Sequence, residues 1–146
     1  MIYEPNQCPI RFALGAFGDR WSLLIIRDML FRGCTHFQEL VDADEGISTS
    51  ILANRLQRLE AQQIIARAPD PGDGLQVLYT LTEKGRDLVP VLLALFVWAE
   101  KHDPETRVPS DLAAQIGREM TVDHDLALDR IRSALAQLRS GDTAPR

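Results

Sequence analysis

Apolar residues recur every three to four positions through the first part of the chain, which predicts a run of helices. The first opens at Cys8, because Pro9 fits the first helical position, where its missing N–H is not needed. A second helix is predicted over residues 20–31, where apolar side chains cover most sides, as in a buried helix. Gly33 ends it, and a short third helix follows over residues 35–41.

A fourth helix is predicted from Ser48, a strong N-cap residue, to about Gln62. Its apolar residues Leu52, Leu56 and Leu59 stand at positions i, i+4 and i+7 and therefore share one face. Polar residues occupy the opposite face. This helix has one side for a protein core and another side for solvent or a partner.

The pattern then changes from helical to extended. Residues 64–68 and 75–81 are rich in strand-forming side chains. The segment 70–74 between them is dense in Asp, Pro and Gly, which are typical turn residues. Two such runs around a short turn predict an antiparallel β-hairpin.

Beyond the hairpin, Thr82 is predicted to cap one long helix over residues 83–102, with more apolar surface than a small domain needs. A linker bracketed by prolines follows, and then two helices over residues 110–120 and 123–138. The second carries an amphipathic stripe of Leu128, Ile131, Leu135 and Leu138. We therefore expect one domain over residues 1–103 and a helical extension over residues 104–146.

The composition, 45% apolar and 25% charged over 146 residues, is that of a folded domain of ordinary size. The longest uncharged apolar run, residues 88–99, is interrupted by Pro90, and a membrane helix needs about 20 such residues. The N-terminus lacks the basic and apolar regions of a signal peptide. A cytoplasmic protein without membrane contact is therefore expected.

The charge is unevenly distributed. The net charge of −5 argues weakly against a nucleic-acid partner, since phosphate contacts need positive side chains. Residues 48–69, however, hold three arginines against one acid, whereas residues 42–45 hold three acids. Positive charge is therefore concentrated on the fourth helix and the strand after it.

Four helices, a hairpin and a long helix follow one another in the order of a winged helix-turn-helix, with residues 35–62 as the helix-turn-helix and residues 70–74 as the wing tip. Several segments resemble the HxlR branch of the MarR-related bacterial regulators over roughly residues 8–101. They are Cys8-Pro-Ile, Trp21-Ser-Leu-Leu-Ile-Ile-Arg-Asp, His36-Phe-Gln-Glu-Leu, Gly46-Ile-Ser-Thr, Leu52-x-x-Arg-Leu-x-x-Leu-Glu and Tyr79-Thr-Leu-Thr-Glu-Lys-Gly.

This resemblance implies a mostly α-helical protein with a small β-hairpin wing and a long dimerisation helix, to which this chain adds a helical C-terminal extension. It implies a dimeric transcription regulator of a family in which several members respond to electrophiles or oxidants. The partners would be a pseudo-palindromic double-stranded DNA operator and a second copy of the chain. Three features depart from the family: the third helix lacks preceding basic residues, the wing is short and acidic, and the extension after Pro104 exceeds the usual family length.

The fourth helix is the candidate reading helix, because an α-helix fits the major groove of DNA. Asn54 and Gln57 can each pair with adenine, and Arg58 can reach guanine or a phosphate. The polar residues at the positive N-terminal end, where backbone N–H groups can hold a phosphate, are Ser48, Thr49 and Ser50. The alternative is an ordinary solvent-facing surface, and the hairpin and the resemblance favour the reading helix.

Three further basic residues are candidates for DNA contact. Arg55 flanks the apolar stripe, so it either contacts DNA or forms a structural ion pair with Glu39 or Glu60. Arg67 and Lys84 are candidate phosphate contacts.

Cys8 and Cys34 are the only cysteines, too few for a disulfide framework and without a zinc-binding pattern. Cys8 precedes Pro9 at a helix N-terminus, which favours the reactive thiolate. The alternative is a small buried apolar residue. The resemblance implies a sensing thiol at position 8 and none at Cys34.

A reversible small-molecule effector is the rival to the thiol. Its pocket would be lined by aromatic residues that also suit a core or a dimer contact, namely Phe12, Trp21, Phe96 and Trp98.

The remaining alternative is a small helical enzyme or an interaction module that does not bind DNA. No nucleophile, base and orienting group form a set, and no Gly-rich phosphate loop occurs, so neither an enzyme nor a cofactor is expected. Asp123, His124 and Asp125 with Asp129 could suggest a metal, but acids in a first helical turn are explained by the helix dipole.

Overall fold

The computed structural model describes residues 7–43, 46–106, 114–115, 118 and 123–139. The chain forms two compact units, Met1–Arg86 and Asp87–Arg146. The division into domains over residues 1–103 and 104–146 stays a prediction. Among the described residues, no helix combines the length and apolar character needed to cross a bilayer.

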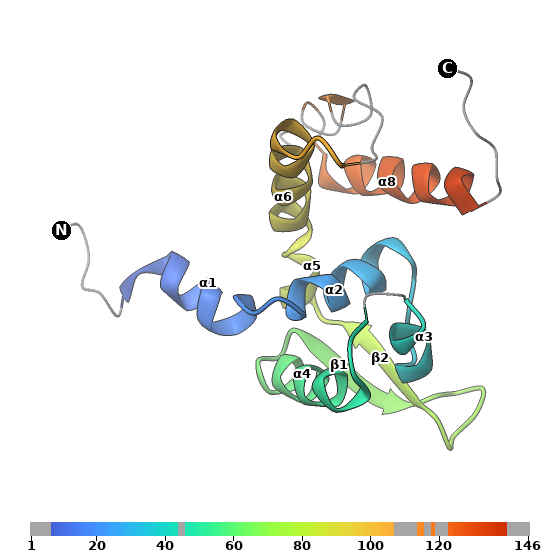
Figure 1. Ribbon diagram of the computed structural model, residues 1–146. Coiled ribbons are helices and arrows are strands. Elements are labelled where there is room, and N and C mark those ends of the chain that lie inside the picture. Colours follow the sequence, from blue (N-terminus) through green and yellow to red (C-terminus); the bar gives the residue numbers. More distant parts are fainter. Residues whose placement is uncertain (1–6, 44–45, 107–113, 116–117, 119–122, 140–146) are drawn as a thin grey trace. The chain divides into compact units, whose positions relative to one another are not determined.

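The first unit holds its helices and a hairpin in the predicted order (Figure 1). They are α1 (Pro9–Phe17), α2 (Ser22–Phe31), α3 (Phe37–Val41), α4 (Thr49–Ala61), β1 (Ile65–Pro69), β2 (Val77–Leu81) and α5 (Glu83–Arg86). The winged helix-turn-helix fold is confirmed, mostly helical with one two-stranded antiparallel sheet.

The core of this unit is built from the apolar stripes of α2 and α4. Ile26 of α2 and Leu52 and Leu59 of α4 are fully buried, and Leu56 is 2% exposed. The predicted stripe of α4 is therefore its core-facing side. Burying four large aliphatic side chains contributes roughly 1.5–3 kcal/mol each to folding.

The hairpin pairs β1 with β2 from Ile65 opposite Leu81 to Pro69 opposite Val77. On the other edge of β2, the backbone N–H of Tyr79 donates to the carbonyl of Thr35 over 2.8 Å. This backbone hydrogen bond joins the segment before α3 to the sheet, and so connects the helix-turn-helix with the wing.

The start of α5 is packed tightly against the end of the α4–β1 connection. Thr82 caps α5 as predicted, since its Oγ1 accepts from the N–H of Gly85 over 3.1 Å and donates to the carbonyl of Ile64 over 3.0 Å. A Cβ atom at position 85 would lie 2.2 Å from the carbonyl oxygen of Ile64. Only glycine allows this approach.

The second unit contains α6 (Val89–His102) and α8 (His124–Arg139), which pack against each other. The prediction of one helix over residues 83–102 was wrong, because the helix is interrupted between Arg86 and Val89. Pro90 explains the break: it has no N–H to bond the carbonyl of Arg86, and its ring would clash there. It instead lies in the first turn of α6.

The amphipathic stripe of α8 is confirmed at Leu128 and Ile131, which are 5% and 4% exposed. Leu135 is half-buried. The side chain of Leu138, and most of the helix predicted over residues 110–120, lie outside the described part of the chain.

Candidate DNA-binding surface

The helix-turn-helix consists of α3, a connecting loop and α4, and a side chain caps the N-terminal end of each helix. Glu39 of α3 accepts hydrogen bonds from the N–H groups of Thr35 and His36 over 2.7 and 3.1 Å. At α4, Oγ of Ser48 accepts from the N–H of Ile51 over 3.3 Å, so Ser48 is the N-cap as predicted. The Ser48 cap therefore fixes the residue at which α4 begins.

The side of α4 opposite its leucines is exposed along its whole length. The exposed residues of this reading face are Thr49, Ser50, Ala53, Asn54, Gln57, Arg58 and Ala61. Apart from the two alanines, these groups can donate or accept hydrogen bonds, and Arg58 is charged. Such a face, on a helix rigidly seated by its other side, has the chemistry for reading base edges.

Arg55 forms a structural ion pair, but neither expected partner is correct. Its Nε donates to Oδ2 of Asp19 over 2.8 Å, and the side chains of Arg55 and Asp19 are 22% and 21% exposed. Glu39 instead caps α3. Arg55 lies at the edge of the core. Its side chain therefore joins α4 to the segment between α1 and α2, where Asp19 lies.

Asp19 is the centre of this junction and sequence reasoning missed it. Its carboxylate also accepts from the N–H groups of Trp21 and Ser22, over 3.0 and 3.1 Å, and from Oγ of Ser22. Burial raises the pKa of Asp19, but the hydrogen bonds from Ser22, Trp21 and Arg55 outweigh burial and hold the pKa below its ordinary value. The signal was an Asp just before an apolar helical run, which is a helix N-cap pattern.

The wing is a compact turn between β1 and β2. The carboxylate of Asp70 accepts from the N–H of Gly72 over 2.8 Å, and that of Asp73 accepts from the N–H of Leu75 over 3.1 Å. Leu75 is 97% exposed. The tip therefore presents acidic and apolar groups, which agrees with the departure noted in the sequence.

A second contact missed by sequence reasoning joins the wing to α3. Nε2 of His36 lies 2.6 Å from Oδ2 of Asp70. This hydrogen bond, together with the nearby charges of Glu39 and Asp70, raises the pKa of His36. The pKa of Asp70 is lowered, mainly by the hydrogen bond from the N–H of Gly72 and next by the hydrogen bond with His36. The two residues are 34 positions apart, so no local pattern indicated the pair.

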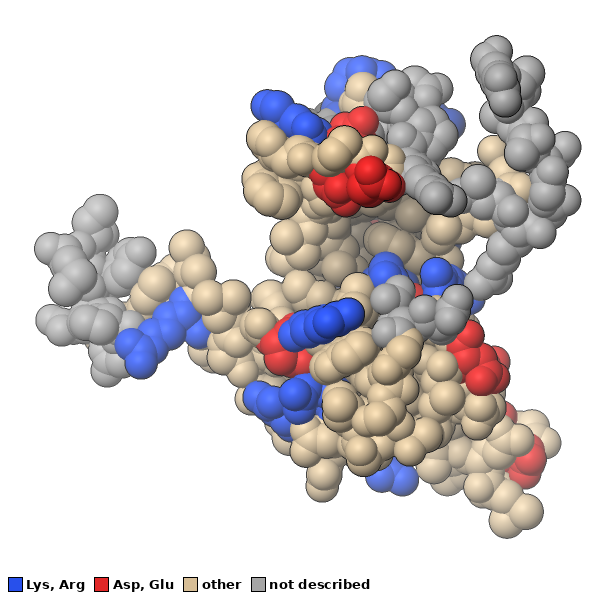
Figure 2. All heavy atoms as spheres, viewed as in Figure 1, with Lys and Arg blue, Asp and Glu red and all other residues tan. Residues whose placement is uncertain are grey.

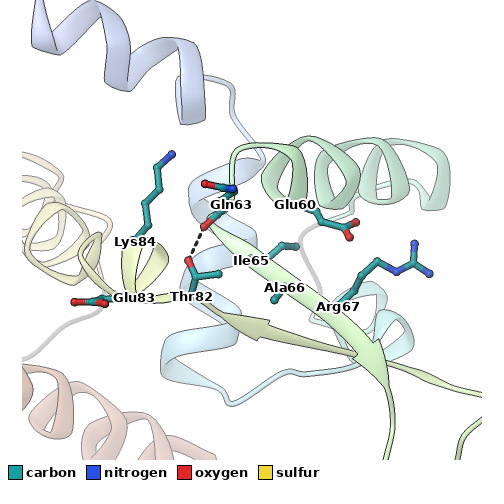
Figure 3. Close-up of a pocket in the computed structure, with 8 residues that line it drawn as sticks. All are labelled: Glu60, Gln63, Ile65, Ala66, Arg67, Thr82, Glu83 and Lys84. Atoms are coloured by element: carbon teal, nitrogen blue, oxygen red, sulfur yellow. Dashed lines mark hydrogen bonds between the residues drawn. The ribbon is translucent and has the colours of Figure 1, made fainter.

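Arg67 and Lys84 lie beside a hollow of about 520 Å³ where α4, β1 and α5 meet (Figure 3). Nζ of Lys84 donates to the carbonyl of Gln62 over 2.7 Å, so it satisfies the C-terminal end of α4. The hollow also has two acids, Glu60 on the side of Arg67 and Glu83 beside Lys84 (Figure 3). DNA contact by Arg67 and Lys84 stays a prediction.

The positive side chains visible in Figure 2 are scattered. On the face drawn in Figure 2, the coloured Lys and Arg atoms form separate small groups and no continuous patch. On α4, which the structure describes in full, Arg55 is paired with Asp19, and Arg58 is the other cation. The reading face of one α4 therefore offers Arg58 as its charged group for phosphate contact.

Cys8 is the N-cap residue of α1. Its carbonyl accepts from the N–H of Phe12 over 3.0 Å, its side chain makes no capping hydrogen bond, and Pro9 begins the helix. Both Cys8 and Cys34 are half-buried thiols. Among the described residues, no group of three or more His, Cys, Asp or Glu side chains is arranged to hold a metal.

The four aromatic residues of the rival effector pocket differ in exposure. Phe12 is 68% and Trp98 is 66% exposed, whereas Trp21 and Phe96 are half-buried. Trp98 stacks on His102 with ring centroids 5.0 Å apart. A pocket formed by these four residues stays a prediction.

Comparison with known proteins identifies the family. The sequence model described as HxlR-like helix-turn-helix matches residues 16–107. The chain belongs to this family. An HTH-type transcriptional regulator of Synechocystis is 40% identical over 88 residues, which is 60% of this chain and 64% of that protein. YodB of Bacillus subtilis, also an HTH-type transcriptional regulator, is 38% identical over 97 residues, covering 66% of this chain and 86% of YodB.

Solved structures agree. The reduced form of the transcriptional regulator YodB from B. subtilis matches with a TM-score of 0.57 and 35% identity, over 68% of this chain and 98% of that one. The redox regulator HypR in its oxidized form matches with a TM-score of 0.56 and 31% identity, over 65% and 97%. The predicted class of this HxlR-like protein, a helix-turn-helix transcriptional regulator and not an enzyme, is confirmed. The family match begins after Cys8, so it does not include the candidate thiol.

Proposed function

We propose that this HxlR-like protein acts as a homodimer that places the reading face of α4 in the major groove of a two-fold symmetric operator. One observation carries the proposal: α4 buries Leu52, Leu56 and Leu59 on one side and exposes a continuous row of hydrogen-bonding side chains on the other. Two-fold symmetry requires half-sites about one turn of DNA apart.

Duplex binding across a salt series tests this role. Specific binding should weaken as salt rises, with a slope of about 0.9 per phosphate contact. Replacing Asn54, Gln57 and Arg58 together with alanine should abolish preference for the operator over unrelated DNA. The matched control replaces Glu100 and Lys101 of α6, a charge-neutral pair, with alanine. Unchanged operator binding by the triple variant, with its fold intact, would place DNA contact on another surface.

Dimerisation is supported by exposed apolar residues on both units, each considered by itself. On α1, Ile10, Phe12 and Leu14 are 60–68% exposed, and on α6, Leu95 and Trp98 are 48% and 66% exposed. A second copy that covers these side chains would remove large apolar areas from water. Light scattering should give the mass of a dimer at micromolar concentration, and a monomer mass would refute this part of the proposal.

The effector we favour is an electrophile or oxidant acting at Cys8. Two related regulators are known in defined redox states: YodB in its reduced form and the redox regulator HypR in its oxidized form. In this chain Cys8 stands at the beginning of α1, next to the apolar residues proposed for the dimer. The thiolate would add to a quinone carbon, and the quinone ring would accept the electron pair and a proton. A coupling of about 1–3 kcal/mol would change operator affinity about 5- to 150-fold.

Operator release after treatment with a quinone tests the thiol. Cys8→Ala is the informative variant, because serine is a strong N-cap and would stabilise α1 in its own right. Cys34→Ala is the matched control. Release should be lost in Cys8→Ala and retained in Cys34→Ala. Release from both variants would leave a reversible ligand as the effector.

A further inference from the structure

The reading face contains one side chain whose orientation is set by the protein itself. Nη1 of Arg55 donates to Oδ1 of Asn54 over 2.5 Å, while Nε of the same guanidinium donates to Asp19 over 2.8 Å. Arginine has only hydrogen-bond donors, so the Asn54 atom that faces it has to be the amide oxygen. The amide nitrogen is therefore turned away from Arg55.

The guanidinium is itself held in place. It is planar, and its Nε is bound to a carboxylate that already accepts from Ser22 and from the backbone at the start of α2. Asp19 and Arg55 are about one-fifth exposed, whereas Asn54 is exposed. A fixed, half-buried pair therefore orients an exposed amide on α4.

We infer that Asn54 is a specificity-determining residue that presents only its NH₂ group to DNA and selects a base edge with acceptors and no donor. This inference rests on the proposed reading role of α4. Recognition of adenine by asparagine needs both the oxygen, to accept from N6–H, and the nitrogen, to donate to N7. With the oxygen turned to Arg55, the N6–H₂ group of adenine faces a donor. Guanine (O6 and N7) and thymine (O4) fit the NH₂ group, and cytosine (N4–H₂) does not.

Asp19 and Arg55 are positioning residues in this arrangement. Arg55 contributes to sequence selection without touching a base, and Asp19 does so through Arg55. A merely structural Arg55–Asp19 pair would affect stability and leave base preference unchanged, which separates the two roles.

Selection of binding sites from a randomised duplex pool, followed by measured affinities for single-base variants, tests the inference. The wild-type protein should prefer guanine or thymine at the position that Asn54→Ala relaxes, by at least about fivefold over adenine. Arg55→Lys keeps a cation for Asp19 but lacks the planar fork that also holds Asn54. It should admit adenine at that one position and leave the other positions unchanged.

Asn54→Asp is the nearly isosteric counterpart. It keeps an oxygen for Arg55 and replaces the outward NH₂ with an acceptor, so the preference should move to cytosine or adenine at the same position. Thermal melting of each variant shows whether it is folded.

The outcomes are distinguishable. If the wild-type protein selects no sequence at all, the proposed DNA-binding function fails and the inference fails with it. If it selects a sequence with adenine at the Asn54 position, or if Arg55→Lys shows the wild-type preference there, the function stands and the inference is overturned. Unchanged preference in Asn54→Asp overturns it as well.

Discussion

Helices α1 and α4 both carry large apolar residues, but the two helices bury them to opposite extents. On α4, three leucines are at most 2% exposed. On α1, whose nine residues the structure describes completely, none is buried, and Ile10, Phe12 and Leu14 are mostly exposed. Within one chain, the apolar side of α4 is therefore covered by the core, whereas the apolar side of α1 stays exposed.

The two helices also differ at their first residues. Ser48 caps α4 with its side chain, and Lys84 bonds the carbonyl of Gln62 at the other end. Cys8 gives α1 no side-chain cap. The first turn of α4 is therefore held by a capping side chain that the first turn of α1 lacks.

The largest expected effect is on the α4 side. Leu56→Ala should lower the free energy of unfolding by about 2–5 kcal/mol, because it leaves a cavity in a packed core. Chemical denaturation at a protein concentration low enough for monomers measures this. Phe12→Ala in the same assay should have little effect, since Phe12 is 68% exposed within one chain. Equal losses for the two variants would remove the contrast between the helices.

Association should show the reverse order. In a symmetric dimer Phe12 is buried twice, so Phe12→Ala should weaken self-association about 100-fold or more. Sedimentation equilibrium measures the constant. The matched control is Leu75→Ala on the wing, which is also an exposed apolar residue, 97% exposed. Equal weakening by both variants would show that α1 has no special part in the dimer.

The helix caps sharpen the comparison at a smaller scale. Ser48→Ala should cost about 1 kcal/mol of stability, because the N–H of Ile51 loses its acceptor. Cys8→Ser should give a gain in α1, where a capping side chain is missing. Amide hydrogen exchange in the first turn of each helix reports the two changes, and they should have opposite signs. Slower exchange in α4 after Ser48→Ala would contradict the capping role.

The smallest expected effect is a pH dependence where the wing meets α3. The raised pKa of His36 means that its bond to Asp70 contributes stability in full below about pH 6.5 and loses it as the pH rises through the raised value. The lowered pKa of Asp70 means that the contribution is also lost in acid, as the pH falls through that value.

An NMR titration of the His36 ring should therefore give a midpoint above 6.5 in the wild-type protein and a lower one in Asp70→Asn. An unchanged His36 midpoint in the variant would show that Asp70 does not cause the shift.

Local patterns predicted most of the fold. The spacing of Leu52, Leu56 and Leu59, the cap at Ser48 and the turn residues after β1 each report on neighbouring positions, so they identified α4 and the hairpin. The prediction of one long helix over residues 83–102 was wrong. A strong apolar pattern continues across Pro90, and the prediction gave this pattern more weight than the proline.

The site was harder to predict because its arrangement depends on distant pairs. Arg55 joins Asp19 across 36 positions, and His36 joins Asp70 across 34. Sequence reasoning correctly offered an ion pair for Arg55 but chose Glu39 and Glu60 as its partners, and the structure pairs it with Asp19. Which acid lies opposite a given arginine is decided by how α2 packs on α4, and a single sequence does not contain that geometry.

The close approach of Gly85 to the carbonyl of Ile64 has a consequence for sequence variation. The space at position 85 is already filled by the backbone of another segment, so every side chain, even a methyl group, is excluded. At Gly15 and Gly74, in contrast, a Cβ atom would meet no atom within 4 Å. In a library of single substitutions, position 85 should therefore accept only glycine, whereas positions 15 and 74 should accept other residues. Among related sequences, the wing tip at Gly74 should accordingly vary more than position 85, where the chain leaves β2.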